Sequence, residues 1–202
     1  EELEAGKDFG RYKDVDGDGI PWRTLPGTHP TKGAFFTRGT TRDPYARYSE
    51  RGQDYIYNME RLIKKFRTAA DLVPQPVLRA GKKPAAAGVI YFGSTSPAMH
   101  EALDVLEEED LHFDALRLCA FPFPDSVARF IADHPQVFVV EQNRDAQMHS
   151  LLVNELDVDP ARLKRVLHYD GTPITARFIA GAIRKLVRPV AAPAPTARKE
   201  LA

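Results

Sequence analysis

The sequence has 202 residues and a mass of 22.6 kDa, which allows one substantial domain with an appendage, or two small domains. Its 28 basic residues balance its 28 acidic residues, so charge gives no reason to expect a nucleic acid or an anionic membrane as a partner. No apolar run approaches the roughly 20 residues of a membrane helix, and no secretory signal is recognisable. We therefore expect a cytoplasmic protein.

The single cysteine, Cys119, excludes an internal disulfide and an iron–sulfur cluster held by this chain alone. Because it lies within the apolar segment 116–121, we expect a buried structural thiol. No spacing of His, Cys, Asp or Glu resembles a metal site. The first residues, EELEAGKDFG, lack an initiator methionine, so we expect a fragment of a longer polypeptide.

The first half of the chain is mostly irregular in pattern. Residues 9–49 are rich in Gly, Pro, Thr and aromatic residues, which is typical of a long loop. A helix is predicted from Gly52, because four apolar residues fall on one helical face: Ile56, Met59, Ile63 and Phe66. The segment VPQP (73–76) ends this helix, and AGKKP (80–84) indicates a linker.

From residue 85 the pattern alternates between strand and helix. Short apolar runs predict strands at 87–92, 115–121, 137–140 and 165–168, and each is followed by a helical stripe. Thr172 and Pro173 are expected to open the last helix. Such alternation favours an α/β fold, a three-layer sandwich with a mainly parallel sheet. The Pro/Ala-rich end, residues 189–202, is predicted to be a disordered tail.

The stretch KDVDGDGI (13–20) begins like a calcium-binding loop. Counted from Asp14, the EF-hand positions 3 and 5 are Asp16 and Asp18. Position 12, which needs a bidentate glutamate, is Leu25, and position 8 is Pro21. The spacing therefore favours a solvated Asp/Gly turn over an EF-hand.

This turn leads into IPWRTLPG (20–27), which places Arg23 on a backbone stiffened by prolines. A planar guanidinium suits a carboxylate or a phosphate, so one hypothesis is an anion clamp. The alternative is an arginine that ties the loop to the rest of the domain.

Several segments resemble one family in the same order. DGIPWRTLPG resembles the DGxSPRxxPG segment in the α subunits of 2-oxoacid:ferredoxin oxidoreductases, especially the 2-oxoglutarate type. The later segments GVIYFGSTSPAMHEALDVL, LRLCAFPFP, VFVVEQNRDAQM and LHYDGTPITARFI resemble the C-terminal domain of that subunit. The resemblance covers residues 10 to 187, and VVEQNRDAQ together with YDGTPIT is its most specific part.

The resemblance implies a division into domains. Residues 1–79 would be the C-terminal end of a thiamine-pyrimidine-binding domain with a linker helix, and residues 80–188 a transketolase C-terminal-like α/β domain. The missing N-terminal part of the α subunit would carry the YPITPST-type motif.

The resemblance also implies an activity, the coenzyme A-dependent oxidative decarboxylation of a 2-oxoacid, here 2-oxoglutarate to succinyl-CoA, with electrons passed to ferredoxin. Thiamine diphosphate, Mg²⁺ and [4Fe–4S] clusters would serve the whole complex and be bound mainly by a partner β subunit, in an α2β2 or larger assembly. This chain alone would hold none of them and would be inactive without its partner chains.

Site residues follow from the same resemblance. Arg23 is similar to the family arginine that reaches toward the 2-oxoacid carboxylate, with Thr24 as its neighbour. His29 is a candidate contact for coenzyme A or another anion. We expect no catalytic residue and no metal ligand in this chain. Pro21-Trp22 stands where the family often has Ser-Pro, a departure next to Arg23 that leaves the pose of its side chain open.

Two further motifs lie in the second half. The turn 93–96 is expected to cap the helix that follows it, and the cluster 141–144 is expected to pack domains or subunits together. Two alternative functions stay open. The chain could be a non-catalytic α/β assembly module, or the C-terminal domain of another thiamine-dependent 2-oxoacid dehydrogenase.

Overall fold

The structure, a computed structural model, describes residues 1, 3–5, 9–85 and 87–187. The chain forms two compact units, residues 1–73 and residues from 74 onward, which are described separately below. The predicted disordered tail, residues 189–202, lies outside the described residues. Within the described part of the chain, no helix has the length and apolar character needed to cross a membrane.

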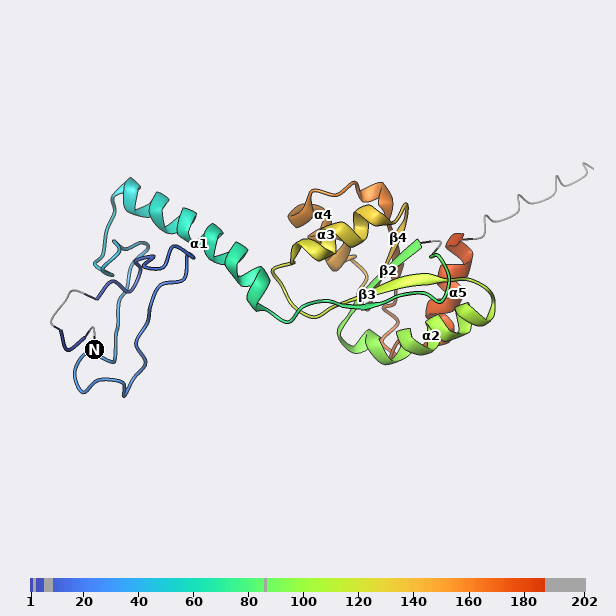
Figure 1. Cartoon of the computed structure of the whole chain (residues 1–202), viewed down its shortest axis with the longest axis horizontal. Coiled ribbons are helices and arrows are strands. Elements are labelled where there is room, and N and C mark those ends of the chain that lie inside the picture. Colours follow the sequence, from blue (N-terminus) through green and yellow to red (C-terminus); the bar gives the residue numbers. More distant parts are fainter. Residues whose placement is uncertain (2, 6–8, 86, 188–202) are drawn as a thin grey trace, which may run out of the picture. The chain divides into compact units, whose positions relative to one another are not determined.

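The first unit consists of one long helix and an irregular chain that folds against it (Figure 1). Helix α1 spans Gly52–Leu72 and ends before the VPQP segment, as predicted. Its buried side chains are polar, Asn58 and Arg61. The apolar stripe that defines the helix in the sequence is exposed instead: Ile56, Met59, Ile63 and Phe66. The polar face of α1 is therefore the one that contacts the loop.

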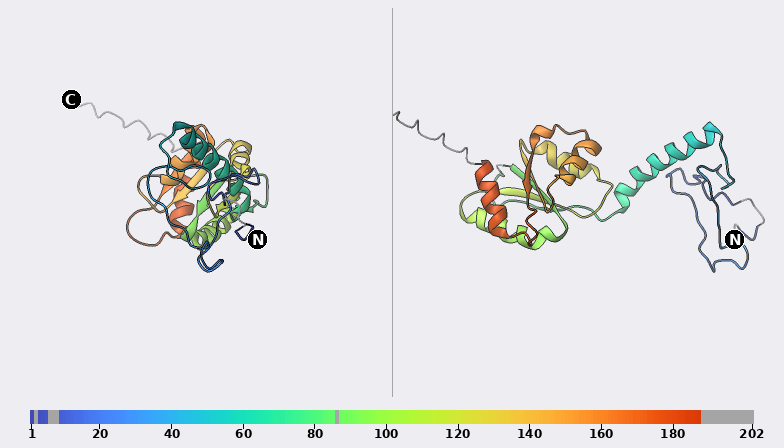
Figure 2. Two further views of the ribbon diagram at one scale, coloured as in Figure 1. Left: turned by 90° about the vertical axis from the view of Figure 1, so that its left-hand side faces the viewer. Right: turned by 180° about the vertical axis from the view of Figure 1, so that it is seen from behind.

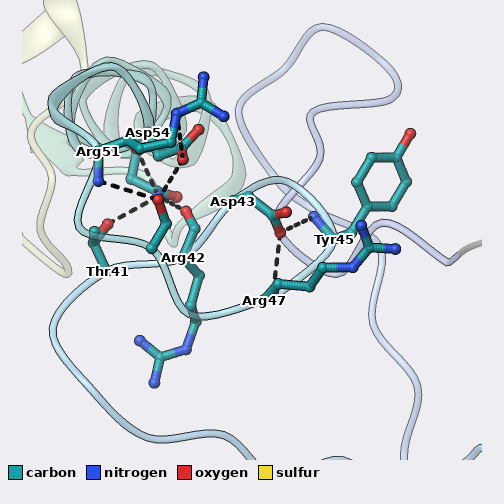
Figure 3. Close-up of polar contacts among 9 residues, drawn as sticks. Thr41, Arg42, Asp43, Tyr45, Arg47, Arg51 and Asp54 are labelled. Atoms are coloured by element: carbon teal, nitrogen blue, oxygen red, sulfur yellow. Dashed lines mark hydrogen bonds and ion pairs between the residues drawn. The ribbon is translucent and has the colours of Figure 1, made fainter.

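Hydrogen bonds fasten the loop to the first half of α1. The amide of Asn58 donates to the carbonyl oxygen of Arg42 at 2.6 Å and to that of Asp54 at 2.9 Å. The Ser49 hydroxyl donates to the Asp54 carboxylate at 2.5 Å. Figure 3 shows this cluster together with Asp43, whose carboxylate accepts two backbone N–H groups of its own turn. The loop, most of whose large apolar side chains are exposed, is thus held by polar contacts to the helix.

The second unit is built on a five-stranded sheet with the order β1-β3-β2-β4-β5. Strand β1 is antiparallel to β3, and the other neighbouring pairs are parallel. The strands are β1 (Val77–Arg79), β2 (Ala87–Phe92), β3 (Phe113–Leu118), β4 (Val137–Glu141) and β5 (Leu163–Leu167). The four predicted strands are confirmed as β2 to β5, although β3 and β5 each begin two residues earlier than predicted. The central strands β2 and β4 are the nearly continuous apolar runs expected of strands covered on both faces.

Two helices cover each face of the sheet (Figures 1 and 2). Helices α2 (Ser96–Glu108) and α5 (Ala176–Val187) enclose one core, and α3 (Asp125–Asp133) and α4 (Gln147–Leu156) enclose the other. Short 3₁₀ turns, Gly93–Thr95 and Pro160–Arg162, precede α2 and β5. Alternate residues of β4 face opposite cores, with Phe138 in one and Val139 in the other. The predicted α/β class, a mainly parallel sheet between two helical layers, is confirmed.

Three details differ from expectation. Strand β1 was not predicted; it lies before residue 80, and Arg79 joins it to α2 through an ion pair with Asp104 at 2.6 Å. Helix α5 begins at Ala176 and not at Thr172. The Thr172 hydroxyl instead bonds the carboxylate of Asp170. Cys119 is exposed and not buried, because β3 ends one residue before it.

Glu141, at the end of β4, is fully buried. Its carboxylate accepts the backbone N–H groups of Met148 at 2.7 Å and His149 at 2.9 Å, and the amide of Asn143 at 2.8 Å. These backbone donors belong to the first turn of α4, which lacks a conventional side-chain cap. A buried anion from the sheet therefore satisfies the N-terminus of α4.

Candidate anion-binding site

The Asp/Gly turn (residues 14–20) packs directly on α1. Gly19 has a φ of +81°, and a Cβ there would lie 2.4 Å from the backbone nitrogen of Lys65. The Thr68 hydroxyl donates to the carbonyl oxygen of Asp18 at 2.5 Å, and Arg61 donates to that of Gly19 at 3.1 Å. Glycine is needed at this position both for the left-handed backbone and for the close approach to the helix.

The three aspartates of the turn have structural partners. Asp14 pairs with Lys64 at 3.4 Å, Asp16 accepts the Trp22 indole N–H at 2.5 Å, and Asp18 accepts the N–H of Ile20 at 2.8 Å. Partial burial raises the pKa of Asp14, but two glycine amides of the turn and the Lys64 ammonium outweigh it and hold that pKa below its ordinary value. Among the described residues, no three His, Cys, Asp or Glu side chains lie together as metal ligands would.

The first unit also contains a cavity of about 390 Å³. Arg23 and Thr24 line it from the IPWRTLPG segment, and α1 contributes Arg61, Leu62 and Lys65. Four of the residues that line it carry a positive charge, and none carries a negative charge: Arg11, Arg23, Arg61 and Lys65. We call it the basic cavity. Such a concentration of cations favours an anionic ligand.

Two of these cations are fixed by their surroundings. Arg11 lies 4.6 Å from the centre of the Phe35 ring and donates to the Thr24 hydroxyl and to the carbonyl oxygen of Lys32, the latter at 2.9 Å. Arg61 is 8% exposed and is held by its bond to the turn. Its Nε has no hydrogen-bond partner among the described residues. Arg11 and Arg61 are therefore held in place at the basic cavity by contacts within the first unit.

The other two cations have no partner that would hold them in place. Arg23 is exposed and Lys65 is half-buried. Among the described residues, neither side chain has a hydrogen-bond or ion-pair partner. The hypothesis that Arg23 ties the loop to the domain therefore finds no contact to support it, and its guanidinium is available to a ligand.

Thr24 and His29 have different surroundings. The Thr24 hydroxyl lines the basic cavity but donates to the carbonyl oxygen of Gly33 at 2.9 Å, while it accepts from Arg11. His29 is not among the residues that line the basic cavity. Its Nδ1 accepts the backbone N–H groups of Thr31 at 3.1 Å and Lys32 at 3.0 Å, so Nε2 is the nitrogen left for a further contact.

The sequence did not indicate Arg11, Arg61 or Lys65 as site residues. Arg61 and Lys65 appear in it as ordinary cations on the polar face of an amphipathic helix. One signal was available: the two are four residues apart, and no residue three or four positions from either is acidic. Like charges at this spacing destabilise a helix unless something compensates them.

The sheet offers a second cavity, of about 380 Å³, where the ends of β2 and β4 meet. Open α/β sheets often bind ligands at such a position. Here the amide of Gln142 donates to the hydroxyls of Ser94 at 3.0 Å and Thr95 at 3.2 Å, and Asn143 donates to Glu141. The predicted helix cap at 93–96 is wrong, since Thr95 makes no capping bond and its hydroxyl serves Gln142. The polar groups here satisfy one another, so the basic cavity is the stronger candidate.

Comparison with known proteins supports the family resemblance. No protein-family model matches the chain. The chain is 26% identical, over 185 residues, to 2-oxoacid:ferredoxin oxidoreductase 2, subunit alpha, of Aeropyrum pernix. The matched region covers 89% of this chain and 28% of that subunit. The resemblance to the α subunits of 2-oxoacid:ferredoxin oxidoreductases is therefore confirmed.

A solved structure agrees in fold. It is the 2-oxoglutarate:ferredoxin oxidoreductase from Magnetococcus marinus with 2-oxoglutarate, coenzyme A and succinyl-CoA bound. The TM-score is 0.77 at 20% identity, and the match covers 90% of this chain and 31% of that chain. The chain thus spans less than a third of the length of either protein.

Proposed function

We propose that this chain is part of the α subunit of a thiamine diphosphate- and iron–sulfur-dependent 2-oxoacid:ferredoxin oxidoreductase. The complex would convert 2-oxoglutarate and coenzyme A to succinyl-CoA and carbon dioxide and pass the electrons to ferredoxin. One observation carries the proposal at the level of residues: the guanidinium of Arg23 lines a cavity walled by cations and is not engaged by another described side chain.

In this proposal Arg23 binds the carboxylate of the 2-oxoacid. A guanidinium presents two parallel N–H donors, which match the two oxygens of a carboxylate and fix its orientation. Arg11 raises the local positive potential and, through Thr24, holds the backbone next to Arg23. Thr24 therefore acts as a positioning residue, and Nε2 of His29 is kept as a contact for a coenzyme A anion.

The residues of this chain do not fit the redox and metal groups of the proposed complex. A [4Fe–4S] cluster needs four thiolates, and the chain has one cysteine. No cluster of oxygen, nitrogen or sulfur ligands for Mg²⁺ is present among the described residues. The proposal accordingly assigns thiamine diphosphate, Mg²⁺ and the clusters mainly to a β subunit, which would supply the decarboxylation and electron-transfer chemistry. This chain would bind and orient the substrate.

The two units would have different tasks. The first unit, proposed as the end of a pyrimidine-binding domain, contributes the basic cavity. The sheet unit, proposed as transketolase C-terminal-like, would serve assembly with the β subunit and with the rest of the α subunit. Its cavity at β2 and β4 supports this division, because the polar side chains there are already paired with one another.

The proposal is tested in the complex reconstituted with its β subunit and a full-length α subunit. The assay is the reduction of ferredoxin with 2-oxoglutarate in the presence and absence of coenzyme A. Replacing Arg23 by Ala removes a charge-assisted pair, so kcat/KM should fall by about 10- to 100-fold. The change should appear mainly in KM, and Arg23→Lys should restore part of it, since the charge remains without the fork.

A matched control is Arg67→Ala, on an exposed arginine of α1 that does not line the basic cavity. This variant should keep the kinetic constants of the parent. If the complex reduces ferredoxin without any 2-oxoacid requirement, or if Arg23→Ala resembles Arg67→Ala, the proposed function is wrong.

A further inference from the structure

The face of α1 opposite the loop is apolar and open to water. Asn58, Arg61 and Thr68, on the other face, donate hydrogen bonds to carbonyl oxygens of the loop. The residues of the apolar stripe are 38–55% exposed: Ile56, Met59, Ile63 and Phe66. Helices α2 to α5, in contrast, bury their apolar stripes in the two cores of the sheet unit. A contiguous apolar stripe on an exposed helix face indicates an interaction surface.

The stripe has the spacing of a coiled-coil seam. Apolar residues recur at alternating intervals of three and four residues as far as the residue that caps the helix: Ile56, Met59, Ile63, Phe66, Ala70 and Val73. This spacing keeps one line of side chains facing a second helix over several turns. A partner helix with the same spacing matches it best, and a second copy of α1 has that spacing by definition.

Two opposite charges lie along one edge of this seam. Glu60 and Arg67 each follow a seam residue directly, so they occupy equivalent positions seven residues apart. Both are exposed, and neither has a hydrogen-bond or ion-pair partner among the described residues. They cannot pair with each other, because seven residues span about 10 Å along a helix. Charges that flank an apolar seam select the partner helix and its direction.

An antiparallel pair of α1 helices satisfies both the seam and the charges. When Ile63 faces Phe66 of the second copy, the same register sets Met59 against Ala70 of that copy. It also places Glu60 of each copy beside Arg67 of the other. A parallel pair would set this charged edge against the opposite edge of the seam, where the flanking residues are uncharged: Tyr55, Leu62 and Ala69. Charge complementarity therefore favours the antiparallel arrangement.

We infer that α1 is a self-association element, through which two copies of this chain join by an antiparallel helix pair. The apolar seam forms the contact, and two Glu60–Arg67 ion pairs border it. The inference goes beyond the proposed function, because neither the substrate nor the basic cavity takes part in it. Arg61 and Lys65, which line the basic cavity, lie on the opposite face of α1, so association leaves each cavity open.

Sedimentation velocity of the 202-residue chain measures this association. The fraction of dimer should rise with protein concentration. Ile63→Glu places a charge at the centre of the seam and should leave the chain monomeric, while circular dichroism shows an unchanged fold because Ile63 is 55% exposed. Gln53→Glu is the matched control, since it adds the same charge at an exposed position of α1 outside the seam, and it should dimerise as the parent does.

A charge exchange tests the direction of the pair. Glu60→Arg would bring two guanidinium groups together at each edge and should weaken the dimer about 10-fold at low ionic strength. Adding Arg67→Glu to this variant restores two opposite-charge pairs and should recover the parent affinity. Arg67→Ala alone removes only exposed ion pairs and should weaken the dimer by a few-fold at most. A double variant that stays as weak as Glu60→Arg contradicts the antiparallel register.

Disulfide cross-linking tests the helix pair in the complex reconstituted with a full-length α subunit. In a Cys119→Ser background, Met59→Cys combined with Ala70→Cys should link two α subunits under oxidising conditions. These positions face each other across the antiparallel pair but lie about three turns apart on one helix, too far for a bond within one chain. Met59→Cys alone is the control and should give no link, because the two copies of this position are distant in this register.

The remaining outcomes contradict the inference. A chain that stays monomeric at every concentration, or a complex that gives no cross-link with the two cysteines, would mean that another part of the α subunit or the β subunit covers the stripe. A cross-link through Met59→Cys alone would indicate a parallel pair. None of these results bears on Arg23, whose role is read from the kinetic constants of Arg23→Ala, so the inference and the proposed function fail separately.

Discussion

The substitution Gly19→Ala would separate the Asp/Gly turn from α1 and remove the hydrogen bond that holds Arg61 at the basic cavity. Gly19 has a φ of +81°, and an added Cβ would lie 2.4 Å from the backbone nitrogen of Lys65 and 2.8 Å from the carbonyl oxygen of Arg61. Backbone atoms of a helix cannot move aside as a flexible side chain would. The turn must therefore retreat from the helix.

The size of the effect follows from comparison with Gly27→Ala. Gly27 has a φ of +90° but no atom within 4 Å of an added Cβ. A left-handed backbone destabilises a non-glycine residue by about 1–2 kcal/mol. Alanine also lowers the conformational entropy of the unfolded chain, which stabilises the folded state by about 0.4–1 kcal/mol. Gly27→Ala should then lower the free energy of unfolding by about 1 kcal/mol. Gly19→Ala additionally loses the hydrogen bonds from Arg61 and Thr68, about 1 kcal/mol each, for a total near 3 kcal/mol.

Urea denaturation followed by tryptophan fluorescence measures this difference. Trp22 is the single tryptophan of the chain and belongs to the first unit, so its signal reports that unit alone. Gly19→Ala should unfold at clearly lower urea than Gly27→Ala. Equal losses of stability in the two variants would refute the close packing of the turn on α1.

Two further predictions concern the sheet unit. Glu141→Gln keeps the shape of the side chain but turns an amide NH₂ toward N–H donors at the start of α4. Denaturation followed by circular dichroism should show that the free energy of unfolding falls by about 2–3 kcal/mol. A change below about 0.5 kcal/mol would contradict the capping role. Burial, followed by the charge of Arg165, holds the pKa of His149 below its ordinary value of 6.5. The unfolded chain therefore takes up a proton first, and stability should fall as the pH drops below about 6.5. A His149→Gln variant should flatten this dependence, and an unaltered pH profile would exclude it as the cause.

The sheet was predictable because its physical constraints are local. The central strands β2 and β4 are covered by helices on both faces, and so each appears in the sequence as a nearly uninterrupted apolar run. Strand β1 escaped prediction because it has three residues, two of them exposed, at the edge of the sheet. Only its pairing with β3 and the contact of Arg79 with α2 hold it there, and both are tertiary interactions.

The candidate site was predictable only in part. Arg23 could be proposed from its stiff, proline-flanked segment and from the family resemblance. The other cations of the basic cavity could not, because amphipathic periodicity normally directs the apolar face of a helix inward. In α1 the loop packs on the polar face, where Asn58 and Arg61 satisfy loop carbonyls, and Ile63 remains exposed. Which face is covered depends on the hydrogen-bonding groups of a loop distant in sequence.

A crystal structure of the reconstituted complex with 2-oxoglutarate would test the central claim most directly. The account predicts that a carboxylate of the ligand lies within hydrogen-bonding distance of the Arg23 guanidinium, in the basic cavity of the first unit. A ligand bound elsewhere in the complex, with Arg23 turned to solvent, would contradict it.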